Sequence, residues 1–163
     1  MSIIQLLLGK LSKDVVIEIA ESQIRVFSFN GEAEYYDEPL IAIKTDGKKE
    51  TILEIGKNAA THVASDVTVL NPFSHPRSMV ASFTFAEKII QHAIRELHQS
   101  IFRPAPRVIM HQLEKNEGGL TEIEDRVLRE LALGAGAREV IVYSGAKINK
   151  QIDSYDAIKS KFT

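Results

Sequence analysis

The sequence contains no cysteine and carries no surplus of positive charge. Without cysteine the chain can form neither a disulfide nor a thiolate metal site, and this composition is compatible with a reducing cytoplasm. The formal net charge of −2 leaves no basic excess for a phosphate backbone, so we expect no nucleic acid as a main partner. No apolar run approaches the roughly 20 residues that span a bilayer, and the N-terminal leucines are followed by no small-residue cleavage site.

Motifs for catalysis and for metal binding are missing as well. The five histidines are scattered, and no pair has the spacing of a metal-binding helix, so we expect no metal. No phosphate-binding loop with a lysine and no nucleophile elbow occurs. Asp14, Glu18 and Glu139 give a weak match to the carboxylate cluster of ribonuclease H nucleases, because no second acid clearly falls on the fourth strand.

What the sequence does contain is a strand, a capped helix and a second strand between residues 103 and 145. Residues 108–110 and 140–143 are short apolar runs, typical of strands buried on both faces. Thr121 and Glu124 have the spacing of a capping box at the start of the intervening helix. The apolar residues of that helix recur at helical spacing and predict one buried face: Ile123, Val127, Leu128 and Leu131. Such a unit predicts two parallel strands with a right-handed crossover.

The remaining segments predict a mixed sheet covered by helices. Three strands at residues 15–20, 24–29 and 40–43 have short connections and predict an antiparallel meander. The longest apolar helical pattern covers residues 83–101, and a short last helix near 154–161 has Asp153 as its expected cap. Less regular segments are predicted as strands at 51–55 and 67–70 and a short helix at 58–64. This order predicts an α/β fold, a ribonuclease H-like (actin-type) mixed sheet flanked by helices with a small inserted subdomain.

The expected domain organisation is one domain after an N-terminal amphipathic segment. The domain covers residues 13–163, with the insert at about 46–80. The whole chain of 163 residues is long enough for a sizeable core. The segment is residues 1–12, and its apolar side consists of Ile3, Ile4, Leu7, Leu8 and Leu11. This side either docks on the chain's own core or a second copy, or lies in a membrane interface, where Lys10 and Lys13 add little attraction to anionic lipid.

Several strings in the sequence resemble those of the MreB family, the bacterial actins that direct rod shape. The matches, in order, are Glu38-Pro39, Ile55-Gly56, AEKIIQHAIRELHQS at 86–100, RPAPRV at 103–108 and, most specific, GAGAREV at 134–140. They cover about residues 14–143. The resemblance implies a two-domain actin fold with ATP and magnesium in the cleft between the domains, and this chain is long enough for the first domain only.

The chain departs from that family at the loop that binds phosphate. The family has Asp-Leu-Gly-Thr-Ala-Asn, whereas this chain has Glu18-Ile19 followed by Ala20, Glu21, Ser22 and Gln23. The glycine that lets backbone approach a phosphate is gone, and Glu21 adds a negative charge. We therefore expect a degenerate nucleotide loop and no bound ATP or magnesium. Glu18 and Glu124 occupy the family's magnesium-placing and water-activating positions, but the capping box alone explains Glu124, so no catalytic residue is expected.

The resemblance and the degenerate loop together predict a protein that is not an enzyme. The expected function is an MreB-like cytoskeletal or cell-shape-related scaffold, a pseudo-ATPase whose partners are itself or a full-length MreB-type protein. The expected location is cytoplasmic, with peripheral contact at the inner membrane through the N-terminus as one of the two options for that segment. The alternative is half of an actin-like ATPase that binds nucleotide only when a partner supplies the second domain.

Overall fold

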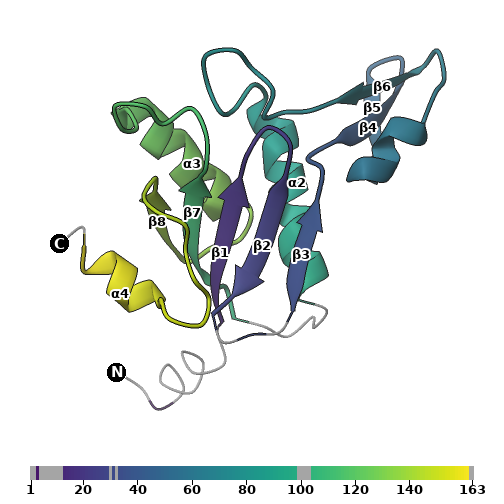
Figure 1. The fold of residues 1–163 in the computed structure, drawn as a ribbon. Helices are drawn as coiled ribbons and strands as arrows, with labels where there is room; N and C mark the ends of the chain where they lie inside the picture. Colours follow the sequence, from purple (N-terminus) through teal and green to yellow (C-terminus); the bar gives the residue numbers. More distant parts are fainter. Residues whose placement is uncertain (1–2, 4–12, 30, 32, 99–103, 162–163) are drawn as a thin grey trace.

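A five-stranded mixed sheet forms the centre of the computed structural model, which describes all residues except 1–2, 4–12, 30, 32, 99–103 and 162–163. Its strands lie in the order β3-β2-β1-β7-β8 (Figure 1). They are β1 (Asp14–Ile19), β2 (Ile24–Ser28), β3 (Glu34–Asp37), β7 (Arg107–Gln112) and β8 (Glu139–Tyr143). The strands β1, β7 and β8 are parallel, while β2 and β3 are antiparallel to their neighbours, as an α/β mixed sheet requires. The predicted fold class is confirmed.

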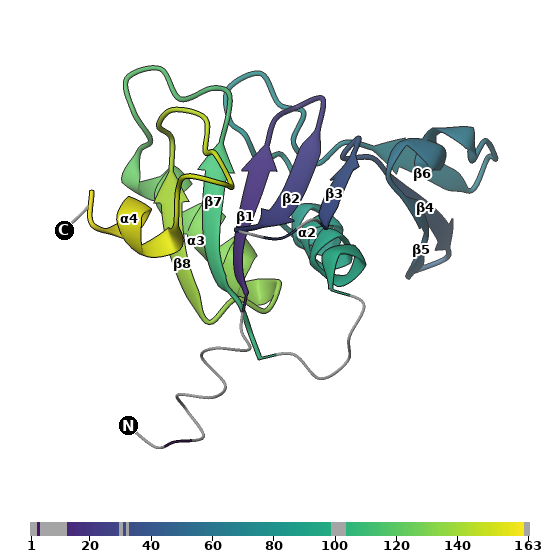
Figure 2. The same cartoon turned by 60° about the horizontal axis from the view of Figure 1, so that its bottom comes forward.

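Helices cover both faces of this sheet. The two long helices, α2 (Phe83–Leu97) and α3 (Glu122–Gly134), lie on one face, and the short α4 (Tyr155–Lys159) lies on the other (Figure 2). The larger hydrophobic cluster fills the space under α2 and α3. A smaller cluster of Val16, Phe27, Ile109, Tyr143, Ile148, Tyr155 and Ile158 lies under α4. The strands β1 and β7 therefore contribute buried side chains to both faces, which explains their nearly continuous apolar sequences.

A second, three-stranded sheet projects from the first in the order β5-β4-β6. It consists of β4 (Ile41–Asp46), β5 (Lys49–Ile55) and β6 (Val67–Leu70), with the 3-10 helix η1 (Lys57–Thr61) between the last two. The prediction that residues 40–43 form the third strand of the main meander is wrong, because that place belongs to β3. The second sheet accordingly begins at Ile41, earlier than the expected start of the insert near residue 46.

The capped helix α3 agrees with its prediction except at one apolar position. Thr121 and Glu124 form both hydrogen bonds of the capping box, and Leu128 and Leu131 are buried. Ile123, in contrast, is 76% exposed, because it lies in the first turn, beyond the edge of the core. The predicted cap of α4 is also wrong: the Ser154 hydroxyl accepts the amide of Ala157, whereas Asp153 accepts the amide of Asn149 in the preceding turn.

Candidate functional site

The β1–β2 hairpin turn, residues 20–23, forms the tip that corresponds to the expected nucleotide loop. Its backbone is closed by two hydrogen bonds, from the Ala20 amide to the Gln23 carbonyl (2.9 Å) and from the Gln23 amide to the Ala20 carbonyl (3.4 Å). The outward amide of Glu21 donates to Glu114 Oε2 at 3.0 Å. A carboxylate of this chain therefore already occupies the donor that an anionic ligand would need.

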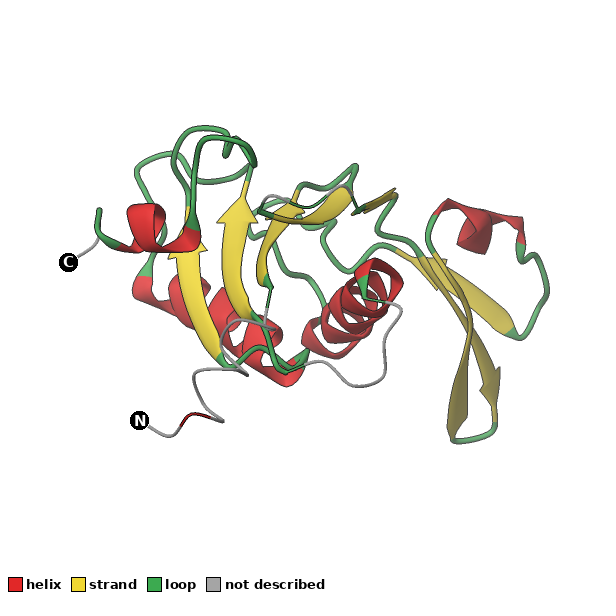
Figure 3. Cartoon of the chain, turned by 90° about the horizontal axis from the view of Figure 1, so that it is seen from below, coloured by secondary structure: helices red, strands yellow, loops and turns green. Residues whose placement is uncertain are grey.

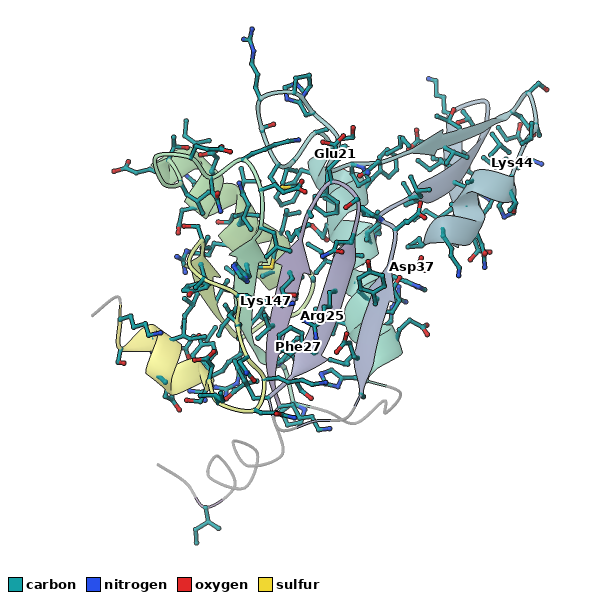
Figure 4. All side chains as sticks on the ribbon, in the orientation of Figure 1. Glu21, Arg25, Phe27, Asp37, Lys44 and Lys147 are labelled. Carbon is teal, nitrogen blue, oxygen red and sulfur yellow. The ribbon has the colours of Figure 1, made fainter. Side chains whose placement is uncertain are left out.

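The side chain of Glu21 is held by two other loops (Figure 4). Its carboxylate accepts from Ser74 Oγ at 2.8 Å and from Lys115 Nζ at 3.1 Å, and its carbonyl accepts from Asn71 Nδ2 at 2.7 Å. These hydrogen bonds, first from Ser74 and then from Lys115, lower the pKa of the Glu21 carboxyl, so it is ionised at neutral pH. The turn is thus a small internal salt-bridged cluster, and its residues do not fit the phosphates of a nucleotide.

Glu18, at the family's magnesium-placing position, lies deep in the sheet between two basic side chains. It is 2% exposed, and its Oε2 accepts from Arg25 Nη1 at 3.1 Å. On the neighbouring strand β7, His111 Nδ1 lies 3.5 Å from Glu18 Oε1. Burial raises the pKa of Glu18, but hydrogen bonds and charge from His111 and Arg25 outweigh burial, and the net pKa lies below the ordinary value. This chain therefore supplies Glu18 with a positively charged partner, Arg25, and with a neighbouring imidazole, His111.

The basic partners of Glu18 also contact other groups of the chain. Arg25 Nε and Nη2 donate to the two carboxylate oxygens of Glu34 at 2.7 and 2.9 Å, and its guanidinium lies 4.5 Å from the centre of the Phe27 ring. His111 Nε2 contacts the Gly145 carbonyl at 3.1 Å, and because a carbonyl only accepts, this nitrogen carries the hydrogen. The His111 ring also meets Tyr143 edge-on at 4.8 Å, so its orientation is fixed.

A polar cavity of about 480 Å³ opens above this buried cluster. Its walls come from β1, β2, β3, β7 and the two segments that follow β7 and β8. They consist of Glu18, Gln23, Arg25, Glu34, Tyr36, His111, Leu113, Gly145 and Lys147. Charges of both signs are already paired at its floor. Within the described residues no group of three His, Asp or Glu side chains has the geometry to hold a metal ion.

Glu124, the second family-matched acid, lies apart from this cavity at the start of α3. Its Oε2 accepts from both the Thr121 amide and the Thr121 hydroxyl at 2.8 Å. It also lines a separate, mostly apolar cavity of about 230 Å³ beside Gln112, whose Oε1 has no hydrogen-bond partner among the described residues. The structure therefore brings Glu18 and the turn at 20–23 together on one hairpin but places Glu124 at a different cavity.

Several residues of this arrangement were not predicted from the sequence. Arg25 and His111 come from separate strands, and Glu114 and Lys115 come from the long loop after β7, so only the fold joins them to Glu18 and Glu21. The sequence offered one signal for Arg25, because it is a charged residue in the middle of a strand with an alternating pattern. Of the apolar N-terminal residues, Ile4, Leu7, Leu8 and Leu11 lie outside the described part of the chain, and Ile3 alone is described.

Comparison with known sequences gives a consistent result over most of the chain. The family model described as MreB/Mbl protein matches residues 12–149. The cell shape-determining protein MreB of Escherichia coli K12 is 30% identical over 141 residues, which are 82% of this chain and 39% of that protein. The uncharacterized protein YjaA of the same strain is 41% identical over 69 residues, 39% of this chain and 54% of that protein. The chain thus spans about two fifths of the MreB relatives it matches.

Comparison with solved structures gives the same fold. A crystal structure of MreB5 of Spiroplasma citri bound to ADP superposes with a TM-score of 0.64 at 18% identity, covering 82% of this chain and 38% of that one. A non-polymerising mutant of MamK bound to AMPPNP gives 0.61 at 12% identity, covering 82% and 42%. MamK in a double helical filament gives 0.57 at 12% identity, covering 80% and 41%. These likenesses establish an actin-like fold for the chain.

Proposed function

The chain belongs to the MreB/Mbl family of actin-related cell shape proteins, and on this premise we propose that it is a cytoskeletal scaffold that has lost ATP hydrolysis. One observation carries the proposal: the Glu21 turn is satisfied by the chain's own groups. The amide that faces outward donates to Glu114, and the Glu21 carboxylate accepts from Ser74 and Lys115. A phosphate would have to displace the carboxylate of Glu114 and lie beside the carboxylate of Glu21. Each such contact between like charges at 4 Å costs about 1 kcal/mol even in water.

Isothermal titration with MgATP tests this proposal directly. We expect no saturable heat with the wild-type chain at millimolar nucleotide. A matched variant that combines Ala20→Gly and Glu21→Thr with Glu114→Gln removes both carboxylates and restores the glycine of the family's loop, so weak MgATP binding by this variant alone would support the stated cause. Magnesium-dependent ATP binding by the wild-type chain at micromolar affinity contradicts the proposal.

A second candidate function is half of an actin-like ATPase, completed by a partner that supplies the other domain. Two facts favour it: the solved relatives that bind ADP and AMPPNP are more than twice as long as the matched region, and Glu124 lines a cavity. Affinity capture should then recover a partner with the missing domain, and ATP hydrolysis should appear only in the mixture. Glu124→Ala should abolish that activity; if it persists in full, Glu124 has no catalytic role.

We also propose self-association or association with full-length MreB-type proteins, because one relative of the same fold forms a double helical filament. Light scattering after size-exclusion chromatography, across a range of concentrations, measures the assembly. A mass that stays at that of one chain, 18.2 kDa, together with no retention by an immobilised MreB-type protein, contradicts this part of the proposal.

Peripheral membrane contact is the last part of the proposed function. No helix among the described residues is long and apolar enough to cross a bilayer. The proposal rests on the apolar side of residues 1–12, which includes Leu7 and Leu8. Leu7→Glu or Leu8→Glu should abolish sedimentation with liposomes while the urea midpoint stays unchanged. An equal loss of stability in these variants would instead indicate that the segment docks on the protein core.

A further inference from the structure

A groove of about 300 Å³ lies between strand β5 of the second sheet and helix α2. Figure 3 shows the second sheet projecting beside α2. Strand β5 forms one wall and the solvent-facing side of α2 forms the other. The lining residues are Ile52, Leu53, Glu54 and Ile55 from β5, and Lys88, His92 and Arg95 from α2. Together the walls form a channel between a strand and a helix, a geometry in which an extended peptide can lie.

The strand wall of this groove has an unpaired edge. Within the described residues β5 pairs with β4 alone, so its other edge faces no strand. The pairing passes from Ala42 opposite Glu54 to Ile43 opposite Ile52, and Leu53 is therefore an extra residue at a β-bulge. A bulge leaves backbone groups outside the ladder. Ile52 and Leu53 are 39% and 38% exposed, so the same edge offers both backbone hydrogen-bonding groups and apolar surface.

The helix wall is basic. Lys88, His92 and Arg95 have the spacing of one helical face. Lys88 Nζ contacts Gln91 Oε1 and Arg95 Nε contacts the Gln91 carbonyl, both at 3.3 Å, and neither cation has a carboxylate within 4.0 Å in the described part of the chain. His92 meets the Tyr35 ring edge-on, at 5.7 Å between ring centres. This wall therefore presents positive charge that the chain itself does not neutralise.

The lining also includes one acid, which sits on the strand side. Glu54 Oε2 lies 3.9 Å from His62 Nε2, across from the helix wall. It does not pair with Lys88 or Arg95. The groove thus has a positive side along α2 and a mainly apolar side along β5.

We propose that this groove binds an extended peptide segment of a partner protein in which acidic and apolar residues alternate. The segment lies extended along the groove, its apolar side chains cover Ile52 and Leu53, and its carboxylates face Lys88 and Arg95. Alternation places the two kinds of side chain on opposite sides of a strand, as the two walls require. The proposal is independent of nucleotide binding.

Fluorescence anisotropy of labelled peptides against the full chain tests the proposal. The probe is an eight-residue peptide of alternating Val and Glu, and the matched peptide alternates Val and Lys. We expect saturable binding of the Glu peptide only. The combined variant Lys88→Glu and Arg95→Glu should weaken this binding at least about tenfold and should gain binding of the Lys peptide. Arg126→Glu, on the exposed side of α3, should leave the affinity within about twofold.

Three results overturn the proposal. The first is the absence of saturable binding of the Glu peptide at millimolar concentration. The second is binding that does not depend on charge. Either both peptides bind equally, or the Lys88 and Arg95 reversals leave the binding of the Glu peptide unchanged while circular dichroism confirms folding. The third is a dimer, seen by light scattering, that the same reversals dissociate, because the occupant of the groove is then a second copy of this chain.

Discussion

At the scale of single residues, the decisive feature is that two acids of the β1–β2 hairpin, the buried Glu18 and the exposed Glu21, contact side chains of the same chain. Glu18 lies between Arg25 and His111, and Glu21 lies between Ser74 and Lys115. A buried carboxylate without such partners would carry an unfavourable desolvation free energy. Contacts within this chain therefore already engage both carboxylates.

Removing the charge of Arg25 should destabilise the fold strongly. Arg25→Met leaves Glu18, 2% exposed, with His111 as its one basic neighbour among the described residues, and it leaves Glu34 with Lys150 alone. Because breaking a buried ion pair leaves an uncompensated charge, we expect a loss of about 3 kcal/mol in the free energy of unfolding, measured with urea. Lys44→Met breaks the exposed pair with Asp66 and should change stability by less than about 1 kcal/mol. Equal effects of the two variants would refute the central role of Arg25.

The acids of this cluster also predict a pH dependence of stability. The folded-state pKa values of Glu18 and Glu34 lie below the ordinary value of 4.5. A group with a depressed folded pKa stabilises the fold fully above its unfolded pKa, and this stabilisation is lost as the pH falls through the folded pKa. The urea midpoint should therefore be flat near neutral pH and fall below about pH 4.5. Glu18→Gln should show a shallower fall; a slope as steep as that of the wild type would contradict this assignment.

At the scale of elements, α3 shows how a local motif can account for a family-matched acid. Thr121 and Glu124 satisfy free amides at the helix start, as the capping box does in proteins without any catalytic role. Acids in the first turn also complement the helix dipole. The position of Glu124 therefore follows from helix formation alone, whatever chemistry the family performs there.

Two substitutions in the capping box separate these roles. Thr121→Ala removes the hydroxyl that accepts the Glu124 amide, so the unfolding free energy should fall by about 1 kcal/mol. Glu124→Gln keeps a side chain that completes a capping box, and its stability should stay within about 0.5 kcal/mol of wild type. Thermal unfolding followed by circular dichroism measures both. A larger loss in Glu124→Gln than in Thr121→Ala would show that the charge of Glu124, rather than the cap, stabilises this helix.

At the scale of the whole molecule, the segment after β8 joins the ends of the sheet and covers its second face. Arg107 donates hydrogen bonds from Nε to Asp14 Oδ1 at 2.7 Å and from Nη1 to Asp156 Oδ1 at 2.8 Å. These two bonds connect β7, β1 and α4. Its guanidinium lies 4.2 Å from the ring centre of Tyr155, which is fully buried. Lys150 reaches Glu34 on the opposite edge strand at 3.4 Å. The chain thus covers with its own residues a sheet face that would otherwise expose Val16, Phe27 and Ile109.

Truncating the buried ring of α4 should therefore destabilise the molecule as a unit. Tyr155→Ala leaves a large cavity, and we expect a loss of about 3 kcal/mol in the unfolding free energy. Ile152→Ala, at a position 80% exposed in the same segment, should change it by less than about 0.5 kcal/mol. Hydrogen exchange should become faster in β1 and β7 as well as in α4. Faster exchange confined to α4 would show that this segment detaches without affecting the sheet.

The fold was predictable wherever local periodicity and burial coincide. The helices α2 and α3 each have an apolar pattern that one neighbouring layer explains, and the strands β1, β2, β7 and β8 have apolar patterns that the layers on their two faces explain. The strand β3 was missed because its sequence, EYYD, is polar at the edge of the sheet. The apolar residues Ile41 and Ile43 were assigned to the wrong sheet, because burial against the main core does not reveal which strand is the hydrogen-bonding partner.

The sequence by itself determined the class of fold, the capped crossover and the absence of glycine from the turn at residues 20–23. These depend on residue type and short-range spacing, which a sequence displays directly. Only the tertiary structure decided which side chains contact this turn and Glu18: Glu114 and Lys115 meet Glu21 across 93 and 94 residues of chain, and His111 meets Glu18 from the next parallel strand. Such contacts arise from strand order and register, so their partners are set by packing of the whole chain rather than by any local pattern.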